Sequence, residues 1–72
     1  MTAYRQKALA IGQYLHEHGD TKAAIVARSL TEPRTRAILY GNVYGWFDRL
    51  GKGVYRLSAK GKQELRQWTT ID

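Results

Sequence analysis

The hydrophobic positions in the first third of the chain recur at helical spacing. From Ala3 to His18, apolar side chains return every three or four residues, so they line one face of a predicted helix. Gly19 ends this pattern in a turn. A second helix is predicted from Thr21, which we interpret as its N-cap, to about Ser29.

A very short link leads from the second helix to a third one. Only Leu30, Thr31 and Glu32 lie between them, and a link of that length makes two helices cross sharply, as in a helix-turn-helix. We interpret Thr31 as the N-cap of the third helix, with Pro33 in its first turn. The pair Gly41-Asn42 tolerates positive φ and is expected to end this helix.

Alternation of apolar and polar residues replaces the helical repeat after Tyr44 and predicts a β-hairpin. Aromatic and β-branched residues flank Gly51-Lys52-Gly53, which we interpret as a short turn between two strands. Alternation also places Asp48 opposite Arg56 on the outer face, as a pair of opposite charges. A bulge near Leu50 would shift this register.

A last helix is predicted from Ser58, its N-cap, to about Trp68. The order helix, helix, helix, strand, strand, helix is that of a winged helix-turn-helix. We therefore predict a small α+β fold with three helices, a two-stranded β-hairpin wing and a C-terminal helix, with residues 1–72 as a single winged-helix domain. The side chains expected to form the core are Ile11, Leu15, Val26, Leu30, Leu39, Phe47 and Leu57.

Composition argues against several kinds of site. The chain has no cysteine, so disulfides and thiolate metal sites are excluded. His16 and His18 are about 200° apart around a helix and cannot share an ion, so no metal or cofactor is expected. A chain of 72 residues offers little concavity, and no nucleophile–base–acid set stands out. We therefore predict that the chain is not an enzyme.

The hydropathy of the chain argues against a membrane location. No apolar run approaches the about 20 residues of a membrane span. The N-terminus has polar residues every few positions, so we do not interpret it as a signal peptide. The expectation is a cytoplasmic protein without a membrane partner.

Positive charge is concentrated in the second half of the chain. The formal net charge is +6, with a pI near 10.0. Eight basic residues lie from Arg34 to Arg66, against Asp48 and Glu64 as the acidic ones. A solvated surface that keeps a small protein soluble would explain such charges. A helix with arginines beside a hairpin with a basic tip favours a duplex nucleic acid instead.

The candidate binding residues lie on the third helix, at the start of the second helix and on the hairpin. Arginine on an exposed helix face pairs bidentately with guanine in the major groove, and a lysine at a wing tip contacts phosphates or the minor groove. Backbone N–H groups at a helix start hold phosphates as well. The predicted nucleic-acid-binding residues are Thr21, Lys22, Arg34, Thr35, Arg36, Tyr40, Lys52 and Arg56.

Several segments resemble winged-helix DNA-binding domains. Segment 53–61 (GVYRLSAKG) resembles the end of the wing and the capped helix start of many bacterial regulators. Segments 19–27 (GDTKAAIVA) and 42–49 (NVYGWFDR) resemble the C-terminal module of an uncharacterised bacterial family with a restriction-endonuclease-like domain upstream. That resemblance implies DNA binding. Since this chain is expected to lack the upstream domain, the implied nuclease activity and its catalytic residues are not carried over.

Two functions stay open at this point. The first is a duplex DNA-binding module, a small transcription regulator or targeting domain with its third helix in the major groove and its wing on the backbone. The second is a winged-helix protein–protein interaction module that uses Leu9, Ile25 and Tyr40 as an apolar patch. The charge asymmetry favours DNA. Leu9 and Ile25 offer little area for a homodimer, so a weak dimer or none is expected.

Overall fold

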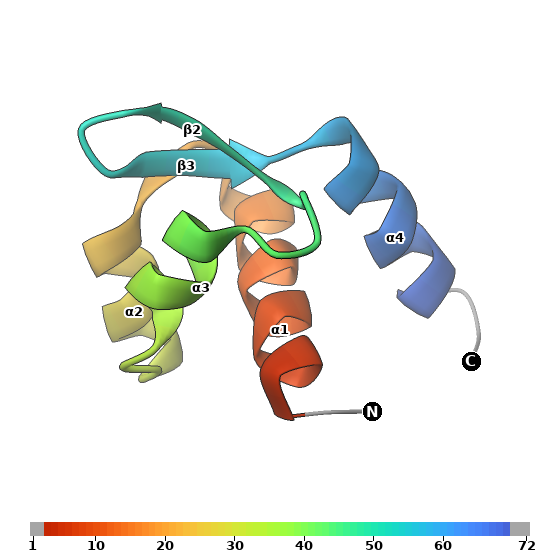
Figure 1. Ribbon diagram of the computed structural model, residues 1–72, viewed down its shortest axis with the longest axis horizontal. Helices are drawn as coiled ribbons and strands as arrows, with labels where there is room; N and C mark the ends of the chain where they lie inside the picture. The colour runs from red at the N-terminus through yellow and green to blue at the C-terminus, as the bar shows by residue number, and fades with distance from the viewer. Residues whose placement is uncertain (1–2, 70–72) are drawn as a thin grey trace.

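The computed structural model describes residues 3–69, which form four helices and a three-stranded antiparallel sheet (Figure 1). The predicted small α+β class is confirmed. The elements in chain order are α1 (Ala3–His18), β1 (Thr21–Lys22), α2 (Ala23–Leu30), α3 (Thr35–Gly41), β2 (Phe47–Gly51), β3 (Val54–Leu57) and α4 (Ala59–Thr69).

Helix α1 is the central element. It contacts α2, α3, α4 and β3, and in Figure 1 it runs between the α2–α3 pair on one side and α4 on the other. The sheet lies across one end of the helices, with the hairpin turn on the same side of the molecule as α2 and α3 (Figure 1). This arrangement brings the hairpin tip close to the two short helices.

The core collects side chains from every helix and from the hairpin. Six of the seven predicted core residues are buried, and the seventh, Leu30, is partly buried against the same cluster. Helix α3 contributes Ile38 and Leu39, each 1% exposed, so its other side is left to solvent. The complete buried hydrophobic cluster is Ala8, Ile11, Leu15, Ala23, Val26, Ile38, Leu39, Trp46, Phe47, Tyr55, Leu57 and Leu65.

The sheet has one strand more than the predicted two-stranded wing. Its order is β1-β3-β2, and the short β1 pairs antiparallel with β3 through Thr21↔Tyr55 and Lys22↔Val54. A strand of two residues is too short to show any alternation in the sequence, which is why the prediction missed it. The consequence is that the start of α2 is tied directly to the hairpin.

The hairpin register agrees with the predicted pairing. Asp48 lies opposite Arg56, and their side chains form an ion pair at 3.6 Å. The register shifts between Arg49 and Gly51, so the bulge considered near Leu50 is present. Bulging at this point increases the local twist of the hairpin just before its turn.

The predicted N-caps of the second and third helices are wrong. Thr21 belongs to β1, where its hydroxyl donates to the carbonyl oxygen of Gly19 at 2.8 Å, and Lys22 holds the N-cap position of α2 without a side-chain bond. Thr31 has φ 51° and closes α2 at its C-terminus. Helix α3 starts only at Thr35, after Arg34 as N-cap, because the turn between the helices extends beyond Thr31.

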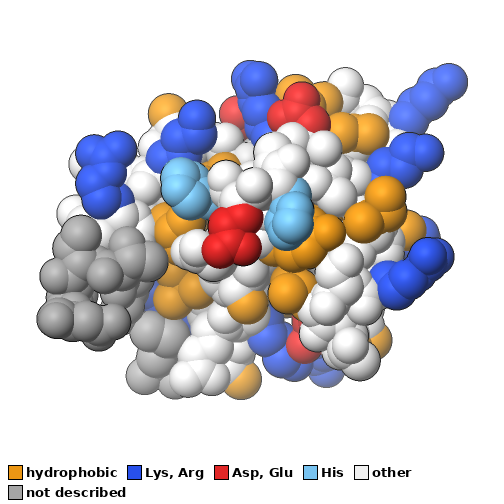
Figure 2. Space-filling model, turned by 180° about the vertical axis from the view of Figure 1, so that it is seen from behind, with side chains coloured by type: hydrophobic (Ala, Val, Ile, Leu, Met, Phe, Trp, Pro, Cys, Tyr) orange, Lys and Arg blue, Asp and Glu red, His pale blue; other side chains and the backbone are white. Residues whose placement is uncertain are grey.

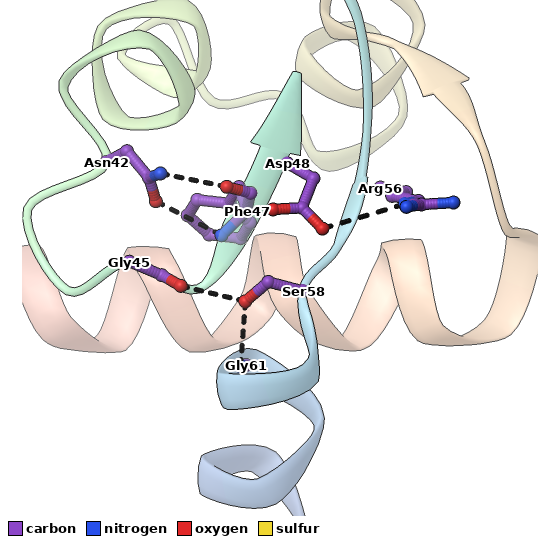
Figure 3. Close-up of polar contacts among 7 residues, drawn as sticks. All are labelled: Asn42, Gly45, Phe47, Asp48, Arg56, Ser58 and Gly61. Atoms are coloured by element: carbon purple, nitrogen blue, oxygen red, sulfur yellow. Dashed lines mark hydrogen bonds and ion pairs between the residues drawn. The ribbon is translucent and has the colours of Figure 1, made fainter. Parts of the chain in front are cut away.

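Two junctions hold the ends of the hairpin (Figure 3). Asn42, in the left-handed conformation predicted to end α3, bonds the backbone of Phe47 at the start of β2. Ser58 caps α4 as predicted, since its Oγ accepts the N–H of Gly61 at 3.0 Å. The Ser58 hydroxyl also donates to the carbonyl oxygen of Gly45 at 2.7 Å. The hairpin is therefore anchored both to the helix before it and to the helix after it.

Aromatic packing fixes the loop between α3 and β2 against α1. The rings of Tyr44 and Trp46 stack with centroids 4.5 Å apart, and the Arg5 guanidinium lies over both rings at 5.5 and 5.9 Å. Trp46 is 3% exposed. These aromatic groups therefore pack the loop against α1.

None of the helices within residues 3–69 combines the length and the apolar character that crossing a membrane requires.

Candidate nucleic-acid interface

A groove of about 550 Å³ lies between three segments that are distant in sequence. These are the start of α2, the exposed side of α3 and the hairpin. The residues that line the groove are Lys22, Ala23, Ala24, Arg36, Ala37, Tyr40, Lys52, Gly53 and Tyr55.

The rim of the groove is cationic. Lys22, Arg36 and Lys52 each come from a different segment, all three are exposed, and the described lining includes no carboxylate. Viewed from behind, Lys and Arg side chains project at the edge of the molecule where the hairpin turn lies (Figure 2). Positive charges on three sides of one concave surface favour an anionic ligand with several charges of its own.

Helix α3 presents Arg36 and Tyr40 to the groove because its opposite side is fixed in the core. Ile38 and Leu39 are buried there, and Thr35 is fully buried with its hydroxyl donating to the Glu32 carbonyl oxygen at 2.8 Å. Arg36 and Tyr40 are four residues apart and therefore neighbours on one face of the helix. Tyr40 is 75% exposed, so its ring and hydroxyl are free to meet a ligand.

A tight hairpin turn sets the backbone conformation at Lys52. Gly51 pairs with Val54, which leaves Lys52 and Gly53 as a two-residue loop with φ values of 39° and 77°. Two successive positive φ values are the signature of a type I′ turn, the tightest common hairpin connection. The N–H of Ala23 donates to the Gly53 carbonyl oxygen at 2.8 Å, so the turn is bonded directly to the start of α2.

Four of the eight predicted site residues meet in this groove: Lys22, Arg36, Tyr40 and Lys52. Arg34 and Thr21 lie near it in the chain but do not line it. Arg34 is exposed, and its N–H donates to a Glu32 carboxylate oxygen at 2.8 Å. Thr35 is fully buried and does not belong to the interface, because a side chain with no exposed surface cannot reach a ligand.

Arg56 lies on the other face of the hairpin from the groove. It pairs with Asp48 and lines a second hollow, together with His16 at the end of α1 and Lys62 on α4. Arg49 is not among the predicted binding residues, but it is exposed on β2. Its cross-strand partner is Tyr55, and directly opposed residues point to the same face of a sheet. The strand register is the signal that would have replaced Arg56 with Arg49 in the set of predicted binding residues.

The apolar patch considered for a protein partner is only partly present. Ile25 and Tyr40 are 45% and 75% exposed, whereas Leu9 is partly buried against the core. Val43, just after α3, is a further exposed apolar side chain at 71%. In the described part of the chain, no three His, Cys, Asp or Glu side chains come together as a metal site would require.

Comparison with protein families finds a match that extends over nearly the whole chain. Residues 1–64 fit the model of a family described as "Putative PD-(D/E)XK phosphodiesterase (DUF2161)". The chain belongs to this family. Neither a curated protein nor a solved structure matches the chain significantly.

Membership of the DUF2161 family supports the predicted association with a restriction-endonuclease-like enzyme. It also overturns one prediction. The expectation that the chain is not an enzyme is wrong, because the family description names a phosphodiesterase. That expectation depended on individual side chains, whereas the family match rests on the sequence pattern over residues 1–64.

The motif in the family description has a partial counterpart in this chain. Asp20-Thr21-Lys22 has the spacing of (D/E)XK, and its lysine lies on the rim of the groove. The only proline of the sequence, Pro33, is followed by Arg34, so no Pro-Asp pair is present. Asp20 lines the second hollow with Arg56, so the acidic residue and the lysine of this segment do not line the same groove.

Proposed function

We propose that this member of the DUF2161 family binds duplex DNA, with the exposed side of α3 in the major groove and the hairpin on the phosphate backbone. The observation that carries the proposal is the meeting of Lys22, Arg36 and Lys52 around one groove. In this proposal the chain supplies the substrate-binding surface of a phosphodiesterase.

We infer that the described elements form a winged helix-turn-helix. Support comes from the order of α1 to α4 with a hairpin between α3 and α4, and from the short turn between α2 and α3. In this type of domain the second helix of the helix-turn-helix enters the major groove. Here that helix is α3, whose outer side carries Arg36 and Tyr40.

The chemistry of the ligand fits the chemistry of the groove. Each strand of DNA is a chain of phosphodiesters, with a negative charge at every linkage, and lysine and arginine neutralise those charges on binding. A guanidinium such as that of Arg36 also pairs bidentately with guanine O6 and N7. The family description names a phosphodiesterase, which is an enzyme that has to hold this kind of backbone.

Binding to a labelled duplex at several salt concentrations tests the proposal. Three to five phosphate contacts predict a log–log slope of about −3 to −4.5 between about 50 and 200 mM salt. Arg36→Gln should weaken binding about tenfold or more on a preferred site, because it removes the proposed bidentate contact. Arg56→Gln is the matched control, and it should change affinity little because Arg56 lies on the opposite face with Asp48.

Two results would contradict the proposal. One is the absence of duplex affinity in the wild-type protein at low salt. The other is an equal loss of affinity in both variants, which would mean that net charge and not the groove carries binding. In either case the exposed side chains of Tyr40 and Val43 make a protein partner the next candidate.

A further inference from the structure

We propose that the groove reads the C5 methyl group of a pyrimidine beside a guanine. This inference rests on the duplex DNA binding proposed above and adds the class of base that the site selects. The observation behind it is the apolar lining between the cations: Ala23, Ala24 and Ala37 offer three methyl groups in one groove.

The three alanines enclose the same space from two helices. Ala23 and Ala24 open α2, whereas Ala37 lies on the exposed side of α3, next to Arg36. Ala23 is 6% exposed, so it forms the floor of the groove, and Ala37 is exposed at its edge. A small apolar group that enters beside the Arg36 guanidinium would therefore meet methyl groups from both helices.

The major groove of DNA offers one apolar group of this size. Thymine carries a C5 methyl group at its major-groove edge, and alanine is among the side chains that contact it. 5-Methylcytosine carries the same methyl group at the same position, so both bases share the chemistry that this lining recognises. Guanine, which presents O6 and N7, is the partner for Arg36.

The rest of the described lining leaves few other ways to read a base. Adenine is typically read by the amide of Asn or Gln, and the N4 amino group of cytosine by the carboxylate of Asp or Glu. None of these four residue types is among the groove residues of the described chain. Tyr40 and the two lysines suit phosphate contacts, which position the protein without reading sequence.

The test begins with sites selected by the wild-type protein from a random duplex library of roughly 20 base pairs, about two turns of B-DNA. In an enriched site, each thymine is then replaced by uracil, which removes the methyl group alone. One position should lose affinity about fourfold, the value of one buried methyl group. Where cytosine stands at that position, its 5-methyl derivative should bind about fourfold better than plain cytosine. The two arms measure the contribution of the methyl group on thymine and on cytosine, and the tighter-binding of the two methylated bases at that position is the natural source.

Two alanine variants show whether the groove makes this contact. Ala37→Ser places a hydroxyl at the edge of the groove and should remove the difference between thymine and uracil while leaving the salt slope unchanged. Ala59→Ser is the matched control, because Ala59 is exposed at the start of α4, outside the groove, and the difference should persist. The neighbouring guanine is tested with 7-deazaguanine, which should weaken the wild-type protein about tenfold and Arg36→Gln not at all.

The outcomes separate this inference from the proposed function. Sites that bind equally with thymine and uracil at every position, or a library without any enriched sequence, overturn the methyl inference and leave duplex binding in place. A thymine–uracil difference that survives in Ala37→Ser overturns it as well. If the wild-type protein binds no duplex at low salt, the proposed function fails together with the inference.

Discussion

Asn42 bonds both backbone groups of Phe47. Its Nδ2 donates to the Phe47 carbonyl oxygen at 2.8 Å, and its Oδ1 accepts the Phe47 N–H at 3.1 Å (Figure 3). The amide side chain thus pairs with Phe47 as a neighbouring strand would. Because Asn42 ends α3 and Phe47 begins β2, these two bonds set the position of the hairpin relative to the helix on which the proposed interface depends.

Replacing Asn42 should therefore destabilise the fold in a graded way. Asn42→Gly keeps the left-handed conformation at φ 46° but loses both bonds, at an expected cost of about 1–3 kcal/mol. Asn42→Ala should cost about 1 kcal/mol more, because a Cβ is unfavourable in that conformation. Urea unfolding measures both differences. The interpretation fails if the alanine variant is as stable as the wild-type protein, or more stable than the glycine variant.

Gly61 and Gly12 should respond in opposite ways to alanine. A Cβ at Gly61 would overlap the carbonyl oxygen of Trp46 and lie 2.8 Å from Cδ1 of Leu57. Overpacking of this kind costs about 1–3 kcal/mol, more than the about 1 kcal/mol that alanine contributes to a helix. At Gly12 the nearest atom is Leu57 Cδ1 at 3.4 Å, so Gly12→Ala should keep the helix benefit.

Thermal unfolding distinguishes the two glycine variants. In a domain of this size, 1 kcal/mol corresponds to about 4–8 °C in Tm. We expect Gly61→Ala to melt below the wild-type protein and Gly12→Ala to melt above it. A Gly61→Ala variant with an unchanged or higher Tm would show that α4 can move away from Trp46 at no cost.

Two isoleucines on neighbouring helices form a matched pair for the core. Ile38 on α3 is 1% exposed, whereas Ile25 on α2 is 45% exposed. Ile38→Ala should cost about 2–5 kcal/mol, which approaches the whole stability of a small domain. Ile25→Ala should change stability by about 0.5 kcal/mol or less. If urea titration shows equal losses in the free energy of unfolding, Ile25 is covered in solution. Sedimentation would then test whether the protein self-associates.

A substitution at Lys52 can remove the positive charge without disturbing the geometry of the turn. It occupies the first position of the type I′ turn with φ 39°, where asparagine is favoured. Lys52→Asn should therefore keep or slightly raise the Tm, while the salt slope of duplex binding falls by about one unit and all sequences weaken alike. Lys62→Asn is the control for the loss of one positive charge, because Lys62 is an exposed residue of α4 outside the groove. If the salt slope is unchanged in Lys52→Asn, the hairpin tip does not contact the DNA backbone.

Local rules of the sequence were enough for much of the fold. The helical repeat of α1, the Ser58 cap, the turn around Lys52 and the left-handed end of α3 at Asn42 all depend on residues that are close in the chain. The Asp48–Arg56 pair also follows, because three residues between the strands, Gly51-Lys52-Gly53, place Asp48 opposite Arg56 when the pairing is counted back from the turn. Of the candidate site, the sequence determined the residue types and the concentration of positive charge between Arg34 and Arg66.

Only the tertiary structure decided which of these residues act together. The strand at Thr21–Lys22 exists because β3 offers free backbone groups to it, and no local pattern signals such pairing. Thr35 is withdrawn from the surface by the packing of α3, and the faces of the hairpin separate Arg56 from Arg49. The groove itself requires three distant segments to converge. These segments come together only because the core packs around α1. Such long-range packing cannot be derived from the order of residues along one helix or strand.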